Sequence, residues 1–310
     1  MQHLPPNVAA NSAFLMSQSI APPAANDGPP LRFGFTALLI GNIAISLGPL
    51  FIRAADTGPV AAGFWRLALA VPFLFLIARG IGQPAAKLDR RLTGLLLFSG
   101  VCFAADLAAW HLGVLQTKMA NSNLFGNSTS FLLPLYAFVV ARHWPTRLQG
   151  FALALAGIGT VLLLGSSFEL SSSNFVGDLL CILAGAFYTI YLIVMERARN
   201  DLAAMPTLAW STLMSAPPML LIALAMGENI IPVDWTPMLG LAFFSQILGQ
   251  SLMIYAIGRV PALLFGITLL IQPMVSALIG WWRFGEVLSP TDLTGALLIA
   301  VALLLVRRNA

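Results

Sequence analysis

Pro145-Thr-Arg-Leu-Gln-Gly150 and Pro290-Thr-Asp-Leu-Thr-Gly295 agree at four of six positions and lie 145 residues apart. A spacing that recurs along a chain indicates that one structural unit is present in two copies. The same offset superposes other residues, namely Trp65 on Trp210, Pro72 on Pro217, Phe98 on Phe243 and Gly113 on Gly258. The sequence therefore predicts two halves built on one plan.

The composition indicates a membrane protein. Hydrophobic residues make up 58% of the 310 residues, charged residues only 9%, and the mean hydropathy is +0.86, which excludes a water-soluble domain of this size. Apolar runs of roughly 17 to 25 residues, enough to cross a bilayer as helix, recur along the chain. They predict ten spans, at 34–52, 59–79, 93–113, 118–140, 147–165, 177–195, 206–226, 237–257, 261–282 and 291–306.

We therefore expect an all-α, polytopic membrane protein with ten transmembrane helices. Ten spans in two copies give five per copy, and an odd number makes the second copy enter from the opposite side, so the repeats at 34–165 and 177–307 are expected to be inverted. Residues 1–33 are rich in Pro, Ala, Asn and Ser and lack the charged and apolar regions of a signal peptide. We expect them to form a disordered cytoplasmic tail.

Basic residues predict the orientation, because cytoplasmic loops are enriched in Lys and Arg. Twelve of the sixteen fall on one predicted side: Arg32, Arg79, Lys87, Arg90, Arg91, Arg142, Arg147, Arg197, Arg199, Arg259, Arg307 and Arg308. Both termini are then expected to be cytoplasmic. This bias accounts for the net charge of +4 without a nucleic-acid partner, since no basic patch is interleaved with aromatic residues on a soluble face.

Motifs for enzymatic chemistry are missing from the sequence. It contains no phosphate-binding loop, no His-Glu-x-x-His, no Cys-x-x-Cys and no Gly-x-Ser-x-Gly. Cys102 and Cys181 lie inside predicted spans, where packing is the expected role. We predict neither an enzyme nor a cofactor or metal site, and no ATP-driven transport by this chain alone.

Polar residues inside the spans predict where a substrate binds, because each must find a partner or line a wet cavity. Within the fifth and tenth spans, residues 151–164 and 296–306 contain only Thr160 as a polar side chain. These two helices are expected to face lipid, which leaves eight helices around a central cavity. The candidate substrate-binding residues are Asn42, Trp65, Asp106, Trp110, His111, Asn123, Asn127, Tyr188, Tyr191, Trp210, Gln246 and Gln250.

Asp106 is the sharpest candidate, because a carboxyl group near the middle of a span is costly unless it is functional or paired. One alternative is a structural ion pair with Arg66 or His111. Another hypothesis is that Asp106 or His111 couples transport to protons.

Two further patterns leave alternatives open. Asn123, Asn127, Ser130 and Pro134 fall at i, i+4, i+7 and i+11, which draws a polar stripe that either lines the cavity or bonds a neighbouring helix. Gln246 and Gln250, four residues apart, carry the same two interpretations. The deep aromatic residues either stack on substrate or pack in the core, whereas Trp144, Trp235, Trp281 and Trp282 stand at span ends, as interfacial belts do.

The last two spans resemble those of a known family. Arg259-Val-Pro-Ala262 leads to Gln272-Pro273, then to Trp282-Arg-Phe-Gly-Glu286, Pro290 and Gly295, while the first half carries the corresponding Pro134, Pro145 and Gly150. With these motifs the chain resembles the EamA-type ten-span permeases of the drug/metabolite transporter superfamily. His143-Trp144 stands where that family commonly has Gly-Glu, so a shared role for the acidic position is not expected.

This resemblance implies a secondary carrier of the inner membrane, similar to exporters of aromatic amino acids, with a central cavity and alternating access. We expect export of amino acids, aromatic or otherwise apolar, and of related metabolites. A multidrug exporter of lipophilic cations is the alternative, and Asp106 facing aromatic rings would suit it. A membrane-embedded enzyme or channel is disfavoured, because the polar residues form no nucleophile, metal or filter pattern. Dimerisation is not required, since one chain holds both repeats.

Overall fold

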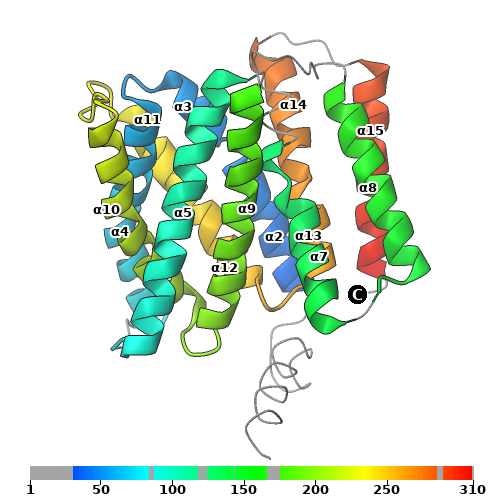
Figure 1. Cartoon of the computed structure of the whole chain (residues 1–310), viewed down its shortest axis with the longest axis horizontal. Helices are drawn as coiled ribbons and strands as arrows, with labels where there is room; N and C mark the ends of the chain where they lie inside the picture. Colours follow the sequence, from blue (N-terminus) through cyan, green and yellow to red (C-terminus); the bar gives the residue numbers. More distant parts are fainter. Residues whose placement is uncertain are drawn as a thin grey trace, which may run out of the picture.

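The computed structural model describes residues 31–83, 87–117, 122, 125–142, 144–165, 175–284 and 289–308, which form helices and short connections without any strand (Figure 1). Eight helical segments of this part are long and apolar enough to cross a membrane, and two apolar helices are shorter, Thr129–Ala141 and Arg147–Leu162. The predicted all-α membrane fold is thus confirmed. The ten expected spans correspond to eight long and two short segments.

The helices follow one another with short connections. Their bounds are α2 Leu31–Ile45, α3 Gly48–Ala54, α4 Pro59–Gly80, α5 Arg90–Gln116, α7 Thr129–Ala141, α8 Arg147–Gly165, α9 Phe175–Ala198, α10 Ala204–Ala225, α11 Thr236–Gly240, the π-helical segment η1 Leu241–Gln250, α12 Ser251–Ala256, α13 Ala262–Leu269, α14 Ile271–Phe284 and α15 Pro290–Arg308.

Three expected spans are interrupted. The first is broken between α2 and α3, where Pro49 stands in the first turn of the new helix, a position at which proline costs no hydrogen bond. The ninth divides at Leu270 into α13 and α14. The eighth contains the wider π-helical turns of η1 between two α-helical pieces. Hydropathy does not reveal such breaks, because every piece is apolar.

The fourth span also differs from the prediction. Helix α7 begins at Thr129, and Asn127 lies in the turn before it. Asn123 lies outside the described residues. The polar stripe is therefore not one continuous helical face over the described part, although Ser130 is buried within α7.

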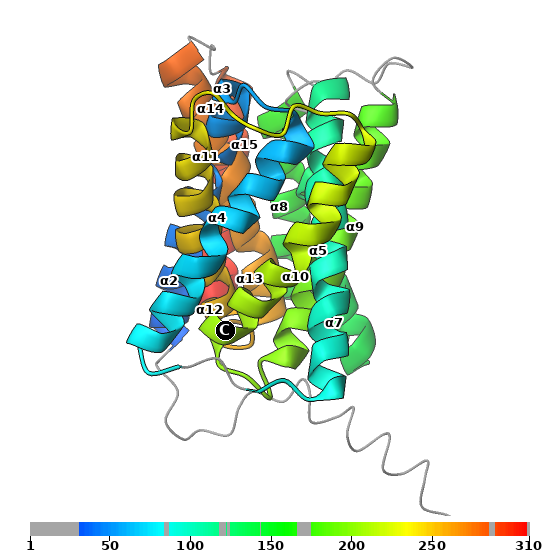
Figure 2. The same ribbon diagram turned by 90° about the vertical axis from the view of Figure 1, so that its left-hand side faces the viewer.

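Close helix packing builds the body of the bundle (Figure 2). Helix α5 packs against α9 and α10, and α10 packs in turn against α4; α2 packs against η1 and α12, and α13 against α7. Small residues allow these approaches: a Cβ atom placed on Gly100 would lie 2.8 Å from the backbone carbonyl carbon of Met214. The core between these helices is apolar and buried.

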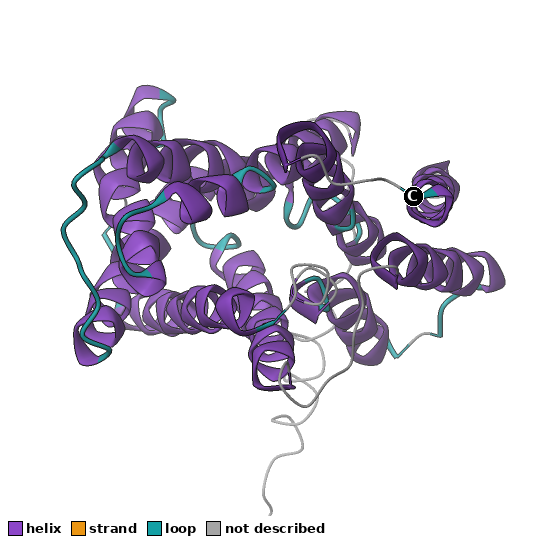
Figure 3. Ribbon diagram, turned by 90° about the horizontal axis from the view of Figure 1, so that it is seen from above, coloured by secondary structure: helices purple, strands orange, loops and turns teal. Residues whose placement is uncertain are grey.

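Helices α8 and α15 pack mainly against each other and lie at one edge of the bundle (Figure 3). A Cβ atom on Gly159 would lie 2.8 Å from the carbonyl oxygen of Gly295, so the two backbones nearly touch. Their near absence of polar residues predicts this peripheral position. They run in opposite directions, which puts Gly150 and Gly295 toward opposite ends of the bundle.

Hydrogen bonds tie connections from the two halves together at one end of the bundle. The Glu228 carboxylate accepts from the backbone amides of Val60 at 3.3 Å and Ala61 at 2.7 Å, in the first turn of α4. Asp56 accepts from the amides of Val233 and Asp234. A carboxylate at a helix N-terminus compensates the orphan amides and the positive end of the helix dipole.

At the opposite end, where α2 begins and α15 ends (Figure 1), Arg199 follows α9 and donates to the carbonyl oxygens of Ile257 and Tyr255. Burial and the neighbouring Arg259 lower the pKa of Arg199 to about 10. Arg259 in turn stacks on the Tyr255 ring, with Cζ 4.3 Å from the ring centroid. Charged side chains thus hold the α9 and α12 ends together here.

Candidate functional site

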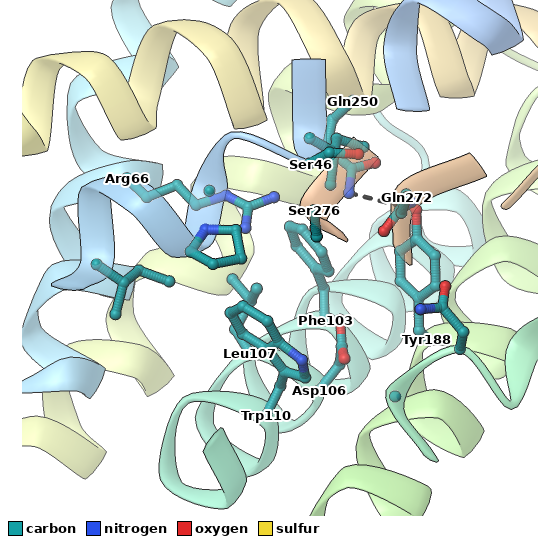
Figure 4. Close-up of a pocket in the computed structure, with 16 residues that line it drawn as sticks. Ser46, Arg66, Phe103, Asp106, Leu107, Trp110, Tyr188, Gln250, Gln272 and Ser276 are labelled. Atoms are coloured by element: carbon teal, nitrogen blue, oxygen red, sulfur yellow. Dashed lines mark hydrogen bonds between the residues drawn. The ribbon is translucent and has the colours of Figure 1, made fainter. Parts of the chain in front are cut away.

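A cavity of about 110 Å³ lies among helices of both halves of the chain (Figure 4). This volume far exceeds the roughly 10–15 Å³ that one water requires. The polar and aromatic side chains that line it are Ser46, Arg66, Phe103, Asp106, Trp110, Asn127, Tyr188, Gln250, Gln272 and Ser276. The lining therefore combines both charges, two serine hydroxyls, three side-chain amides and three aromatic rings.

Arg66 is the only described cation on this lining. It lies on α4, is 5% exposed, and its Nε donates to Gln246 Oε1 at 3.1 Å. Gln246 Nε2 donates onward to the Thr212 hydroxyl at 2.9 Å. These two hydrogen bonds connect Arg66 on α4 through η1 to α10. Because both the oxygen and the nitrogen of the Gln246 amide are bonded, the amide is held in one orientation and in turn orients the Arg66 guanidinium.

Asp106 lies on α5 and is 9% exposed. Among the described residues its carboxylate makes no hydrogen bond and no ion pair, although Arg66 acts on it electrostatically. In the view of Figure 4 the Phe103 ring lies between the two charged groups, and the Arg66 Cζ is 5.8 Å from that ring's centroid. The structural ion pair between Asp106 and Arg66 is therefore not formed.

Aromatic rings make one wall. Phe103 stacks on Tyr191 with centroids 4.5 Å apart, and Tyr191 on Tyr188 at 5.7 Å. Tyr188 and Phe103 line the cavity, whereas Tyr191 is fully buried behind them. The stack gives the cavity a rigid apolar surface beside its charged groups.

Amides connect the remaining wall. Gln272 Nε2 donates to Asn42 Oδ1 at 2.8 Å, and the Asn42 amide donates to the Leu38 carbonyl oxygen. Gln250 Nε2 lies 3.4 Å from the Tyr188 hydroxyl. Asn42 is buried behind Gln272 and does not line the cavity itself.

The structure brings eight of the twelve candidate residues together. Five line the cavity: Asp106, Trp110, Asn127, Tyr188 and Gln250. Three more contact lining residues: Asn42, Tyr191 and Gln246.

Three other candidates, Trp65, Trp210 and His111, do not line this cavity. Trp65 donates to the Ile230 carbonyl oxygen at 2.6 Å and packs edge-on against Trp235. Trp210 packs edge-on against Phe75. His111 hydrogen-bonds through Nδ1 to the carbonyl oxygen of Pro59. Asn123 lies outside the described residues.

Sequence reasoning did not choose Arg66, Gln272, Ser46, Ser276 or Phe103 as binding residues. Arg66 carries a signal, since an arginine inside a span needs a function or a partner, but the sequence does not distinguish a binding role from an ion pair with Asp106. The helix break that places Ser46 beside the cavity leaves no signal in hydropathy. In the described part of the chain no three His, Cys, Asp or Glu side chains gather as metal ligands would.

Comparison with known proteins gives consistent matches. Residues 175–308 match the EamA-like transporter family. An uncharacterized transporter of Archaeoglobus fulgidus is 24% identical over 90% of this chain and 98% of its own. The threonine/homoserine exporter RhtA of Escherichia coli K12 is 27% identical over 87% of this chain and 90% of its own.

A crystal structure of another protein shares the fold. It superposes with a TM-score of 0.73 at 16% sequence identity, over 90% of this chain and 98% of that one. The family match over residues 175–308, the transporter relatives and the helical fold together support the resemblance to EamA-type permeases of the drug/metabolite transporter superfamily.

Proposed function

We propose that this permease is a secondary active exporter of amino acids, aromatic or otherwise apolar, and of related small metabolites. The central cavity carries this proposal, because it places Arg66 and Asp106, two buried and oppositely charged side chains, around one space in a membrane protein of a transporter family. Such groups are expensive to bury without a function. The name of the Escherichia coli relative, a threonine/homoserine exporter, supports amino acids in general as substrates.

The aromatic wall supports an apolar side chain on the substrate. Trp110, Phe103 and Tyr188 offer ring faces to the cavity, and rings bind planar or aliphatic groups by packing. The amides and hydroxyls of the opposite wall suit small polar substrates equally. Both kinds of amino acid therefore belong in the assay.

Alternating access is the proposed mechanism. We propose that residues 34–165 and 177–307 are inverted repeats that rock around the cavity. The opposed directions of α8 and α15 support this arrangement. We place both termini on the cytoplasmic face of the inner membrane, supported by the basic residues Arg199 and Arg259 at that end.

Export of lipophilic cations is the second candidate. Asp106 beside Trp110 and Tyr188 resembles a cation pocket. Arg66 on the same lining opposes it, because a fixed positive charge repels a monovalent cation at short range.

Purified protein in proteoliposomes separates these functions. Vesicles loaded with radiolabelled L-threonine, L-homoserine or L-phenylalanine are diluted into unlabelled competitors or into tetraphenylphosphonium. We expect saturable amino-acid flux that unlabelled amino acids inhibit. Flux of tetraphenylphosphonium without amino-acid flux would select the second candidate, and flux of neither would reject both.

A further inference from the structure

We propose that Arg66 and Asp106 recognise the two charges of one zwitterion: the terminal guanidinium nitrogens of Arg66 bind the α-carboxylate, and the Asp106 carboxylate binds the α-ammonium group. This inference rests on the proposed function and deepens it, since it assigns each end of the substrate to one side chain.

Arg66 is arranged to present its outer edge. Its Nε is occupied by Gln246 Oε1, and no described residue accepts from the two terminal nitrogens. A guanidinium has five N–H donors in a planar fork, and that fork matches the two oxygens of a carboxylate. Because Gln246 is itself held by Thr212, the free edge of Arg66 keeps its direction toward the cavity.

Asp106 offers the complementary group. Its carboxylate lines the same cavity without a hydrogen bond to any described residue, so its oxygens remain available to a donor. The rings of Trp110 and Tyr188 line the space beside it, and ring faces attract cations. An ammonium group therefore finds a carboxylate and aromatic faces together.

The separation of the two charges favours a third body between them. A pair evolved for stability would place the guanidinium and the carboxylate in contact, because two buried charges are compensated only at short range. Here both side chains line one cavity, and no ion pair joins them in the described part of the chain. A molecule that carries both charges on adjacent groups satisfies both side chains at once, and an α-amino acid has this form.

The proposal makes a test possible on the unaltered protein. The substrate is whichever of L-threonine, L-homoserine and L-phenylalanine is carried fastest. Its inhibition by the unlabelled amino acid is compared with inhibition by the methyl ester, which lacks the carboxylate, and by the corresponding 2-hydroxy acid, which lacks the ammonium group. We expect each analogue to compete about ten- to hundredfold more weakly, as befits loss of a charged hydrogen bond. Equal competition by either analogue would overturn the proposal.

Variants then assign the two ends. Arg66→Gln should weaken binding of the amino acid and of the hydroxy acid about ten- to hundredfold, but leave binding of the methyl ester unchanged. Asp106→Asn should weaken binding of the amino acid and of the methyl ester, and leave binding of the hydroxy acid unchanged. Arg66→Lys keeps the charge but loses the fork, and should fall between Arg66→Gln and the wild type.

Two variants serve as matched controls. Arg79→Gln removes an exposed arginine from the same helix, α4, and Asp201→Asn removes an exposed acid from the turn before α10; neither should change any of the three affinities. If Arg66→Gln and Asp106→Asn each weaken binding of all three ligands equally, the two side chains do not bind separate ends of the substrate, and the inference is wrong. If the wild type carries no amino acid, the proposed function itself fails and this inference fails with it.

Discussion

Gln272 Nε2 donates a 2.8 Å hydrogen bond to Asn42 Oδ1, across 230 residues of sequence. The bond joins α14 of the second half to α2 of the first. Asn42 is fully buried and Gln272 lines the cavity, so the bond links the cavity wall to the packing behind it.

Breaking this bond should destabilise the folded protein. Asn42→Leu and Gln272→Leu each leave a partner amide without its acceptor or donor, and a double-mutant cycle should give a coupling of about 0.5–1.5 kcal/mol. Thermal unfolding in detergent measures it. The control is Gln116→Leu, whose exposed amide bonds only within its own helix. Strictly additive effects of the two changes would show that the bond contributes nothing.

Gln246 should act as a positioning residue for Arg66. Gln246→Leu removes the acceptor of the Arg66 Nε, so the guanidinium loses its fixed orientation, and substrate affinity should fall about two- to tenfold. Thr212→Val, which acts one step further away, should have a smaller effect. Equilibrium binding of the substrate to purified protein tests both predictions. An unchanged substrate affinity in Gln246→Leu would show that Gln246 does not position Arg66 for binding.

Asp106 should also decide whether transport depends on a pH gradient. If its carboxylate carries the coupling proton, Asp106→Asn abolishes the response of amino-acid flux to an imposed gradient. Flux is followed in proteoliposomes with and without the gradient, with Asp201→Asn as the control. An Asp106→Asn protein that still responds to the gradient would exclude Asp106 as the proton carrier.

Two glycines of α5 offer a matched pair for packing. A Cβ atom on Gly100 meets the Met214 backbone at 2.8 Å, whereas one on Gly94 meets nothing within 4 Å. Gly100→Ala should destabilise the protein by about 1–3 kcal/mol through overpacking. Gly94→Ala should stabilise it by up to about 1 kcal/mol, because alanine favours helix. Melting temperatures that move in the same direction would contradict the close contact between α5 and α10.

The Glu228 carboxylate should stabilise the start of α4. Glu228→Gln removes its negative charge from the amides of Val60 and Ala61, and we expect a loss of about 0.5–2 kcal/mol. The melting temperature of the variant should fall below that of Asp201→Asn. A fall that disappears at high salt would indicate a long-range charge effect in place of the direct hydrogen bonds.

Much of the architecture could be predicted from the sequence, because bilayer thickness sets the length of apolar runs. The peripheral position of α8 and α15 agrees with the near absence of polar side chains from residues 151–164 and 296–306. The breaks beside Ser46 and at Leu270 could not be foreseen, since each depends on how an apolar helix packs against its neighbours. The π-helical turns of η1 escaped prediction for the same reason.

The cavity was predicted in part. Depth within a span is readable from the sequence, and it selected Asp106 and Trp110, which line the cavity. The direction of a side chain around the helix axis is not readable from depth. Trp65 and Trp210 therefore passed the same criterion, although both pack against other aromatic rings away from the cavity.

The outer pair of helices, α8 and α15, meets the remaining bundle chiefly through α13. This eight-residue element also packs on α7, where a Cβ on Gly266 would lie 2.5 Å from the Ser130 carbonyl oxygen. Most of the close packing between this outer pair and the rest of the described bundle is therefore concentrated at α13. A substitution at Gly266 would consequently disturb the mechanical link between rim and centre while leaving the charged groups of the cavity in place.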